Sequence, residues 1–140
     1  MMNDRYLFRG KRADNGEWET GFLVVERSDT SEERFYITDK MTGYHTPIIP
    51  ETVGQCTGLK GKNGKLIFEG DIVEWYSDYD DIWGYSHTAI IRAVVVWDDK
   101  NYCWGFKVDD EIASFNEWDW DISMVLGNIY DNPELLEVEE

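Results

Sequence analysis

The residues with the clearest chemical potential in this chain are clustered carboxylates. Asp78, Asp80 and Asp81 lie close enough together to suggest a calcium loop, because Ca²⁺ is bound by several oxygen ligands. Ile82 and Trp83 follow, however, where an EF-hand needs an oxygen ligand and a glycine, so the EF-hand motif fails. Loose binding of Ca²⁺ or Mg²⁺ would require several acidic loops to converge. The sequence favours a solvated acidic rim instead.

A second acidic group lies near the C-terminus beside two tryptophans. Glu117, Asp119 and Asp121 would suit a glycosidase, in which two carboxyl groups flank the bond that is cleaved. In a strand, however, Trp118 and Trp120 would point to one face and the three carboxylates to the other. The alternation therefore predicts that the rings enter the core and that the acids line the surface.

The histidines and cysteines form no recognisable metal or nucleophile motif. Neither His45 nor His87 lies within four residues of a cysteine or of the other histidine, so the usual local spacing of zinc ligands is absent. Cys56 has no histidine near it in the sequence, and no strand-to-helix nucleophile elbow is present. Cys56 and Cys103 are expected to be reduced thiols. We therefore expect no cofactor, no metal and no enzymatic activity.

The negative charge is confined to the second half of the chain. Residues 1–68 hold 10 Lys/Arg and 10 Asp/Glu, whereas residues 69–140 hold 3 and 19, so the net charge of −16 belongs to the second half. Such a field repels phosphate and lipid headgroups and attracts basic surfaces. It disfavours direct binding of nucleic acid or of a membrane. The predicted acidic interaction surface comprises Asp78, Asp80, Asp81, Asp98, Asp99, Asp109, Asp110, Glu117, Asp119 and Asp121.

The elements that position these acids are predicted to be strands. The chain has 140 residues, of which 42% are hydrophobic and 15% aromatic, and this composition suits one globular domain over residues 1–140. Aromatic rings favour strands over helices. The chain has no signal-peptide pattern and no run of 18 apolar residues, so we expect a cytoplasmic protein.

Turn residues divide the chain into antiparallel hairpins. The Asn15-Gly16 and Asn63-Gly64 dipeptides are typical of type I′ turns between paired strands. Gly70 suits a tight corner, and the β-branched run 90–97 predicts a strand that a four-residue turn joins to the next one. Residues 118–126 alternate as one further strand. Asn132 and Pro133 predict the start of a short C-terminal helix.

The predicted fold is therefore mainly β, with antiparallel hairpins, a small SH3-like barrel and a short C-terminal helix. An N-terminal hairpin region covers residues 1–56, and a barrel-like acidic region covers residues 57–140, with the barrel itself over residues 57–126. The predicted core comprises Trp18, Phe22, Val24, Ile72, Val73, Trp75, Val94, Val96, Trp120, Ile122, Met124 and Leu126.

Four segments together resemble the YopX family of bacteriophage and prophage proteins. The longest is residues 50–73, with Thr57-Gly58-Leu59-Lys60 and Glu69-Gly70-Asp71-Ile72-Val73. The others are Phe8-Arg9-Gly10-Lys11 with Asn15-Gly16-Glu17-Trp18, then Val96-Trp97-Asp98, then residues 127–135. The resemblance implies a small phage-encoded protein of a bacterial host cell that self-associates. It supplies no catalytic residues.

Three hypotheses for the function follow from these observations. The first is a non-catalytic, self-associating protein-interaction module that binds itself and an unknown host or phage protein, with the neutral half as the self-association surface. The second is an acidic mimic of nucleic acid that occupies a basic host protein. The third is an enzyme with a carboxylate site for a divalent cation, which would need acidic loops that converge.

Overall fold

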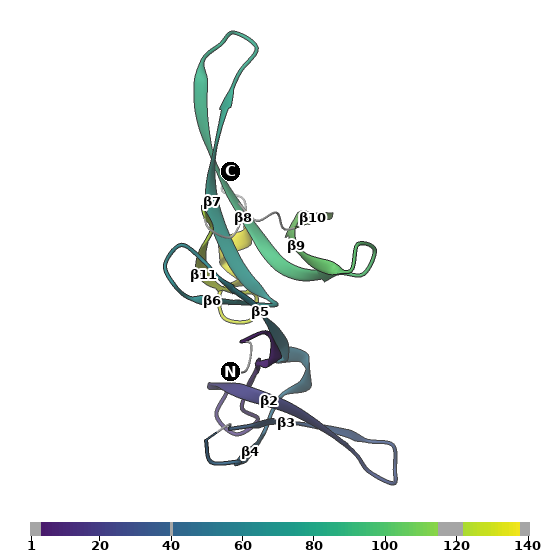
Figure 1. Cartoon of the computed structure of the whole chain (residues 1–140). Helices are drawn as coiled ribbons and strands as arrows, with labels where there is room; N and C mark the ends of the chain where they lie inside the picture. Colours follow the sequence, from purple (N-terminus) through teal and green to yellow (C-terminus); the bar gives the residue numbers. More distant parts are fainter. Residues whose placement is uncertain (1–3, 40, 115–121, 138–140) are drawn as a thin grey trace. The chain divides into compact units, whose positions relative to one another are not determined.

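The computed structural model describes residues 4–39, 41–114 and 122–137, which form strands β1–β11 and three 3-10 turns (Figure 1). The strands are β1 (Phe8–Lys11), β2 (Trp18–Arg27), β3 (Glu33–Thr38), β4 (His45–Pro47), β5 (Gly54–Lys60), β6 (Leu66–Phe68), β7 (Asp71–Asp80), β8 (Ser86–Asp98), β9 (Cys103–Val108), β10 (Glu111–Ser114) and β11 (Met124–Asn128). The turns are η1 (Asp4–Tyr6), η2 (Pro50–Thr52) and η3 (Pro133–Leu136).

The strands form two antiparallel sheets. The first has the order β4-β3-β2-β1-β5-β6 and the second has the order β10-β9-β8-β7-β11. The chain also divides into two compact units, residues 1–58 and 59–140, and β5 crosses the division. The mainly β prediction is confirmed. Among the described strands, however, β10 and β11 remain the edges of their sheet, so the expected closed SH3-like barrel is not found.

The C-terminal helix is only a 3-10 turn. Pro133 does start η3, as expected, but Asn132 makes no capping hydrogen bond. Its side-chain oxygen instead accepts a hydrogen bond from the backbone N–H of Asn128 at 3.3 Å. No helix within the described ranges is long and apolar enough to cross a membrane.

The two hairpins predicted from Asn-Gly dipeptides are present, but their turns differ from the prediction. Gly16 and Gly64 have φ values of +74° and +78°, whereas Asn15 and Asn63 are not among the residues with positive φ. A type I′ turn needs positive φ at both central positions, so that turn type is wrong. At the second hairpin the N–H of Gly64 bonds to the carbonyl of Gly61 at 3.0 Å, which is typical of a type I turn closed by a left-handed glycine.

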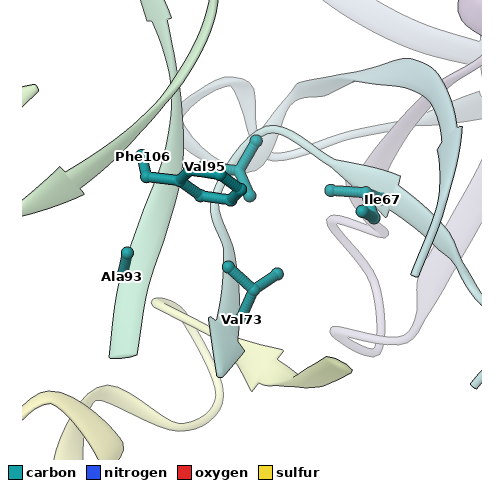
Figure 2. Packing of buried hydrophobic residues seen from close by; sticks show 5 residues of the cluster. All are labelled: Ile67, Val73, Ala93, Val95 and Phe106. Carbon is teal, nitrogen blue, oxygen red and sulfur yellow. The ribbon is translucent and has the colours of Figure 1, made fainter. Parts of the chain in front are cut away.

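The core of residues 59–140 lies between β6, β7, β8 and β9. Figure 2 shows its five buried members, Ile67, Val73, Ala93, Val95 and Phe106. Trp75, Trp104 and Val125 pack against this cluster while they remain partly exposed. The rings of Trp75 and Phe106 have centroids 4.9 Å apart, within the range of favourable aromatic pairs.

The structure confirms Ile72 and Val73 as core residues and corrects the predicted parity of β8. Ala93 and Val95 are buried, whereas Val94 and Val96 are only half-buried. Both parities of this run are apolar, so the local pattern could not distinguish them. The register of β8 with β7 and β9 decides which parity faces the core.

The prediction of one strand over residues 118–126 is also wrong for the part of this segment that the structure describes. The strand begins only at Met124, and Ile122 is 49% exposed. Ser123 is buried and Val125 contacts the core, so the inward parity is the opposite of the predicted one, with Met124 and Leu126 half-buried. Trp118 and Trp120 lie outside the described residues.

In the unit of residues 1–58, the buried side chains include Ile37, Ile48 and Cys56. The predicted core residues Trp18, Phe22 and Val24 are only half-buried. Trp18 is covered by cations, because Arg9 and Lys11 lie 4.8 and 5.5 Å from the centroids of its rings. Such cation–π contacts let a ring remain at the surface.

Gly70 forms the tight corner that the sequence predicted. Its φ is +89°, its N–H bonds to the carbonyl of Val95 at 2.9 Å, and its own carbonyl accepts the N–H of Ile129 at 2.9 Å. The next residue, Asp71, is buried, and its carboxylate accepts the N–H of Phe68 at 2.7 Å. The corner is therefore fixed by backbone and side-chain hydrogen bonds together.

Candidate protein-binding ribbon

The β7–β8 hairpin is longer than the sheet to which it belongs. β11 pairs only with Asp71–Glu74 of β7, and β9 pairs only with Val94–Asp98 of β8. The six pairs from Trp75↔Ile91 to Asp80↔Ser86 therefore have no third strand beside them among the described residues. We call residues 75–91 the distal ribbon. Figure 1 shows it extending beyond β9, β10 and β11.

The two faces of the distal ribbon differ in exposure. Residues that are directly opposite each other share a face, and faces alternate along each strand. The face that continues toward the core is partly covered at Trp75, Ser77, Ala89 and Ile91. The other face is exposed at every pair: Tyr76↔Ile90, Asp78↔Thr88 and Asp80↔Ser86. We call this second face the exposed face of the ribbon.

The tip of the ribbon carries three large apolar side chains in solvent. Ile82, Trp83 and Tyr85 are 91%, 78% and 70% exposed. The N–H of Gly84 bonds to the carbonyl of Asp81 at 3.0 Å, and Gly84 has a φ of +83°. This is the common three-residue hairpin loop, a type I turn followed by a left-handed glycine. The tip is therefore a defined turn that presents aromatic rings outward.

The carboxylates of the ribbon stabilise it through cross-strand hydrogen bonds. Asp78 accepts the hydroxyl of Thr88 at 2.7 Å, and Asp80 accepts the hydroxyl of Ser86 at 2.8 Å. Such bonds contribute about 0.5–1.5 kcal/mol each, which matters because an isolated two-stranded hairpin is marginally stable in water.

Asp81 organises the turn itself. One carboxylate oxygen accepts the N–H groups of Trp83 and Tyr85 at 2.9 and 3.0 Å, and the other bonds to His87 Nε2 at 2.8 Å. The bond from His87, followed by the one from Tyr85, lowers the pKa of Asp81. The His87 ring also stacks on Tyr79, with centroids 5.3 Å apart.

The other predicted surface acids lie on separate turns. Asp99 is in the β8–β9 turn, and Asp109 and Asp110 are exposed in the β9–β10 turn. Asp98 differs from the prediction, because it is only 5% exposed and its carboxylate accepts hydrogen bonds from Lys100 N and from the Asn101 backbone and side chain. Glu117, Asp119 and Asp121 lie outside the described residues.

Within the part of the chain that the structure describes, no three His, Cys, Asp or Glu side chains group so that they could hold a metal ion. His45 bonds to the Thr38 hydroxyl at 2.7 Å, and His87 bonds to Asp81. Cys56 is a buried cysteine and Cys103 a half-buried one, and neither forms a disulfide.

Comparisons with known proteins place the chain in a family. The sequence profile of the YopX protein matches residues 7–137. The chain belongs to the YopX family. The crystal structure of protein EF1440 from Enterococcus faecalis is similar to this YopX chain, with a TM-score of 0.53 and 24% sequence identity over 93% of this chain and 96% of that one. This likeness concerns the fold alone. A search of curated proteins gave no significant match.

Sequence reasoning identified the acids of the YopX ribbon and missed its apolar residues as a surface. Tyr76, Ile82, Trp83, Tyr85 and Ile90 are exposed because the neighbouring strands end before them. One signal was available in the sequence. Residues 66–91 contain no Lys or Arg, and four of the last sixteen are Tyr or Trp, namely Tyr76, Tyr79, Trp83 and Tyr85. Such a segment has no Lys or Arg of its own to neutralise its carboxylates.

Proposed function

We propose that this YopX chain is a non-catalytic protein-interaction module whose docking element is the distal ribbon. The observation that carries the proposal is the exposure of Ile82, Trp83 and Tyr85 on a hydrogen-bonded turn outside the sheet core. Aromatic side chains are enriched at the centres of protein interfaces because they bury much apolar area at little cost in side-chain entropy. Exposed rings clustered at one site mark an interaction surface.

The cross-strand pair Tyr76↔Ile90 supports the same role. Both side chains are exposed. They lie on the exposed face of the ribbon, where the next cross-strand pair is Asp78↔Thr88. A partner that covered this face and the tip would bury apolar groups on a scaffold that is already ordered. Pre-ordering lowers the entropic cost of binding.

The proposal includes self-association through the half of the chain that carries no net charge. Residues 1–68 hold equal numbers of acids and bases, so two copies could meet there without stacking like charges. Size-exclusion chromatography with light scattering on the full chain tests this part. We expect a mass above that of a monomer at high concentration and moderate salt, and a monomer throughout would contradict self-association.

Site-specific photo-crosslinking tests the docking element. A photoreactive amino acid replaces Trp83 in one full-length variant and Tyr102 in another, since Tyr102 is 80% exposed on a different turn of the same sheet. In native bacterial cells we expect the residue-83 variant to form a discrete crosslink with a second protein. Excess wild-type chain should suppress that crosslink, and the residue-102 variant should not form it. Absence of the crosslink, or the same crosslink from residue 102, would contradict the proposal.

A mimic of nucleic acid is the alternative that the acidic charge keeps open. A mimic would depend on its carboxylates and would tolerate loss of its rings, whereas the proposed docking element depends on its rings. Loss of the crosslink from residue 83 when Tyr85→Ser is added therefore favours the interaction module, since Tyr85 is a second exposed ring of the tip. Retention of the crosslink with Tyr85→Ser, together with its loss in the Asp78→Asn/Asp80→Asn double variant, would favour the mimic.

A further inference from the structure

We infer that the surface that receives the distal ribbon is an apolar pocket rimmed by Arg or Lys side chains of a different protein. This inference rests on the proposed function and adds to it the chemistry of the partner. It follows from the exposed apolar groups of the ribbon and from the charge that surrounds them.

The apolar residues of the ribbon lie inside an uninterrupted anionic segment. Residues 66–91 contain six Asp or Glu and no Lys or Arg. Three of those acids, Asp78, Asp80 and Asp81, lie within the ribbon itself, between Tyr76 and the tip. A partner that buries Tyr76 or Trp83 must therefore approach carboxylates at the same time, and an anionic partner would be repelled.

Two of these carboxylates are held in place for recognition. Asp78 and Asp80 share the exposed face, and each uses one oxygen to accept a hydroxyl from the opposite strand. Their other oxygens accept no further hydrogen bond among the described residues. A fixed carboxylate beside an aromatic ring suits a guanidinium group, which pairs with the carboxylate and stacks on the ring.

The same features argue against other occupants. A second copy docked ribbon to ribbon would bring together the three carboxylates of each ribbon, six in all, and neither ribbon contains a Lys or Arg. Nucleic acid and anionic lipid headgroups carry the same sign of charge as the ribbon. Charge complementarity therefore selects a basic protein surface, and the aromatic tip selects one with an apolar recess.

Titration of the labelled full chain with defined peptides tests the inference. The probes are two synthetic peptides of equal length, one alternating Arg with Leu and one alternating Glu with Leu. In ¹⁵N-labelled protein we expect the Arg peptide to shift the amides of residues 76–90 and the Trp83 indole saturably. The Glu peptide should shift none of them. Shifts spread equally over the turns at Asp99 and Asp109 would overturn the inference, because they would report general attraction to acids.

Matched variants separate the two parts of the recognition. Asp78→Asn/Asp80→Asn should weaken binding of the Arg peptide at least threefold, and Trp83→Ser should do the same. Asp109→Asn/Asp110→Asn removes the same charge from another turn and should change the affinity less than twofold. Equal weakening by both double variants would overturn the inference.

The peptide and crosslinking results distinguish this inference from the proposed function. If the partner crosslinked at residue 83 persists in Asp78→Asn/Asp80→Asn, the docking element stands and the basic pocket is wrong. If no partner crosslinks at residue 83, the proposed function fails with it. If the crosslink depends on both Tyr85 and the two aspartates, the proposed function and this inference are both supported.

Discussion

At the scale of single residues, the acids of this chain serve two different purposes. Asp78 and Asp80 lie on the exposed face of the ribbon, whereas Asp71 is only 1% exposed and accepts the N–H of Phe68 at 2.7 Å. A buried carboxylate is tolerated only where hydrogen bonds replace its hydration. Composition alone would assign these acids the same role, because the sequence does not report burial.

The buried acid gives a first prediction. Asp71→Ala should lower the free energy of unfolding by about 1–3 kcal/mol, because it removes the buried carboxylate that accepts the N–H of Phe68. Asp71→Asn keeps a side-chain oxygen and should lose less. Urea unfolding followed by tryptophan fluorescence measures both values. Asp71→Ala with wild-type stability would contradict this account of the corner.

Asp98 gives a prediction about pH. The Asn101 side chain, which donates to its carboxylate at 2.8 Å, lowers the pKa of Asp98, with backbone N–H groups adding to the effect. A carboxylate with a lowered pKa in the folded state contributes stability above its unfolded pKa of about 4 and loses it as the pH falls through the folded value.

The variant Asp98→Asn cannot titrate, so it isolates this effect. We expect wild type to be more stable than the variant at pH 6, and the difference to narrow steadily as the pH is lowered to about 2.5. Thermal unfolding followed by circular dichroism provides the measurement. A difference that is constant over this range would show that the charge of Asp98 has no part in the stability of the turn.

At the scale of elements, the positions of the turns were predictable, but their type and the parity of the strands were not. Gly64 and Gly70 mark a hairpin and a corner because few other residues adopt their positive φ angles. The predicted inward face of β8 was wrong because both faces of this strand are apolar, one with Ala93 and Val95 and the other with Val94 and Val96. Only pairing with β7 and β9 settles such a choice, and that pairing is tertiary information.

The distal ribbon gives a prediction at this scale. Among the described residues no third strand pairs with residues 77–88, so their amides should exchange hydrogen at least about tenfold faster than the amides of Ala93 and Val95. Hydrogen exchange of the full chain, followed by NMR, measures both sets. Equal protection would mean that another part of the chain covers the ribbon.

At the scale of the whole molecule, the net charge differs sharply between the two halves of the sequence. The first 68 residues are balanced, and the remaining residues carry the net −16. Repulsion among so many like charges destabilises a compact state, and dissolved ions screen it. The location of the excess acid could be predicted from the sequence, but the candidate site could not, because it depends on where β9 and β11 stop pairing.

The screening gives a final prediction. Raising NaCl from about 20 mM to about 500 mM should raise the melting temperature of the full chain, since the Debye length falls several-fold over this range. Asp109→Asn/Asp110→Asn removes two exposed charges and should show a smaller rise. A melting temperature that does not depend on salt would contradict the view that repulsion limits stability.

The length of the distal ribbon sets how far its tip extends beyond the neighbouring strands. Removing two residues from each of its strands would draw the tip back by about 7 Å and leave every remaining side chain on its original side. Removing one from each would shorten the reach by half as much but turn the tip to the opposite side. Insertions or deletions can therefore change how far the ribbon extends without changing the packed interior, provided that each strand gains or loses an even number of residues.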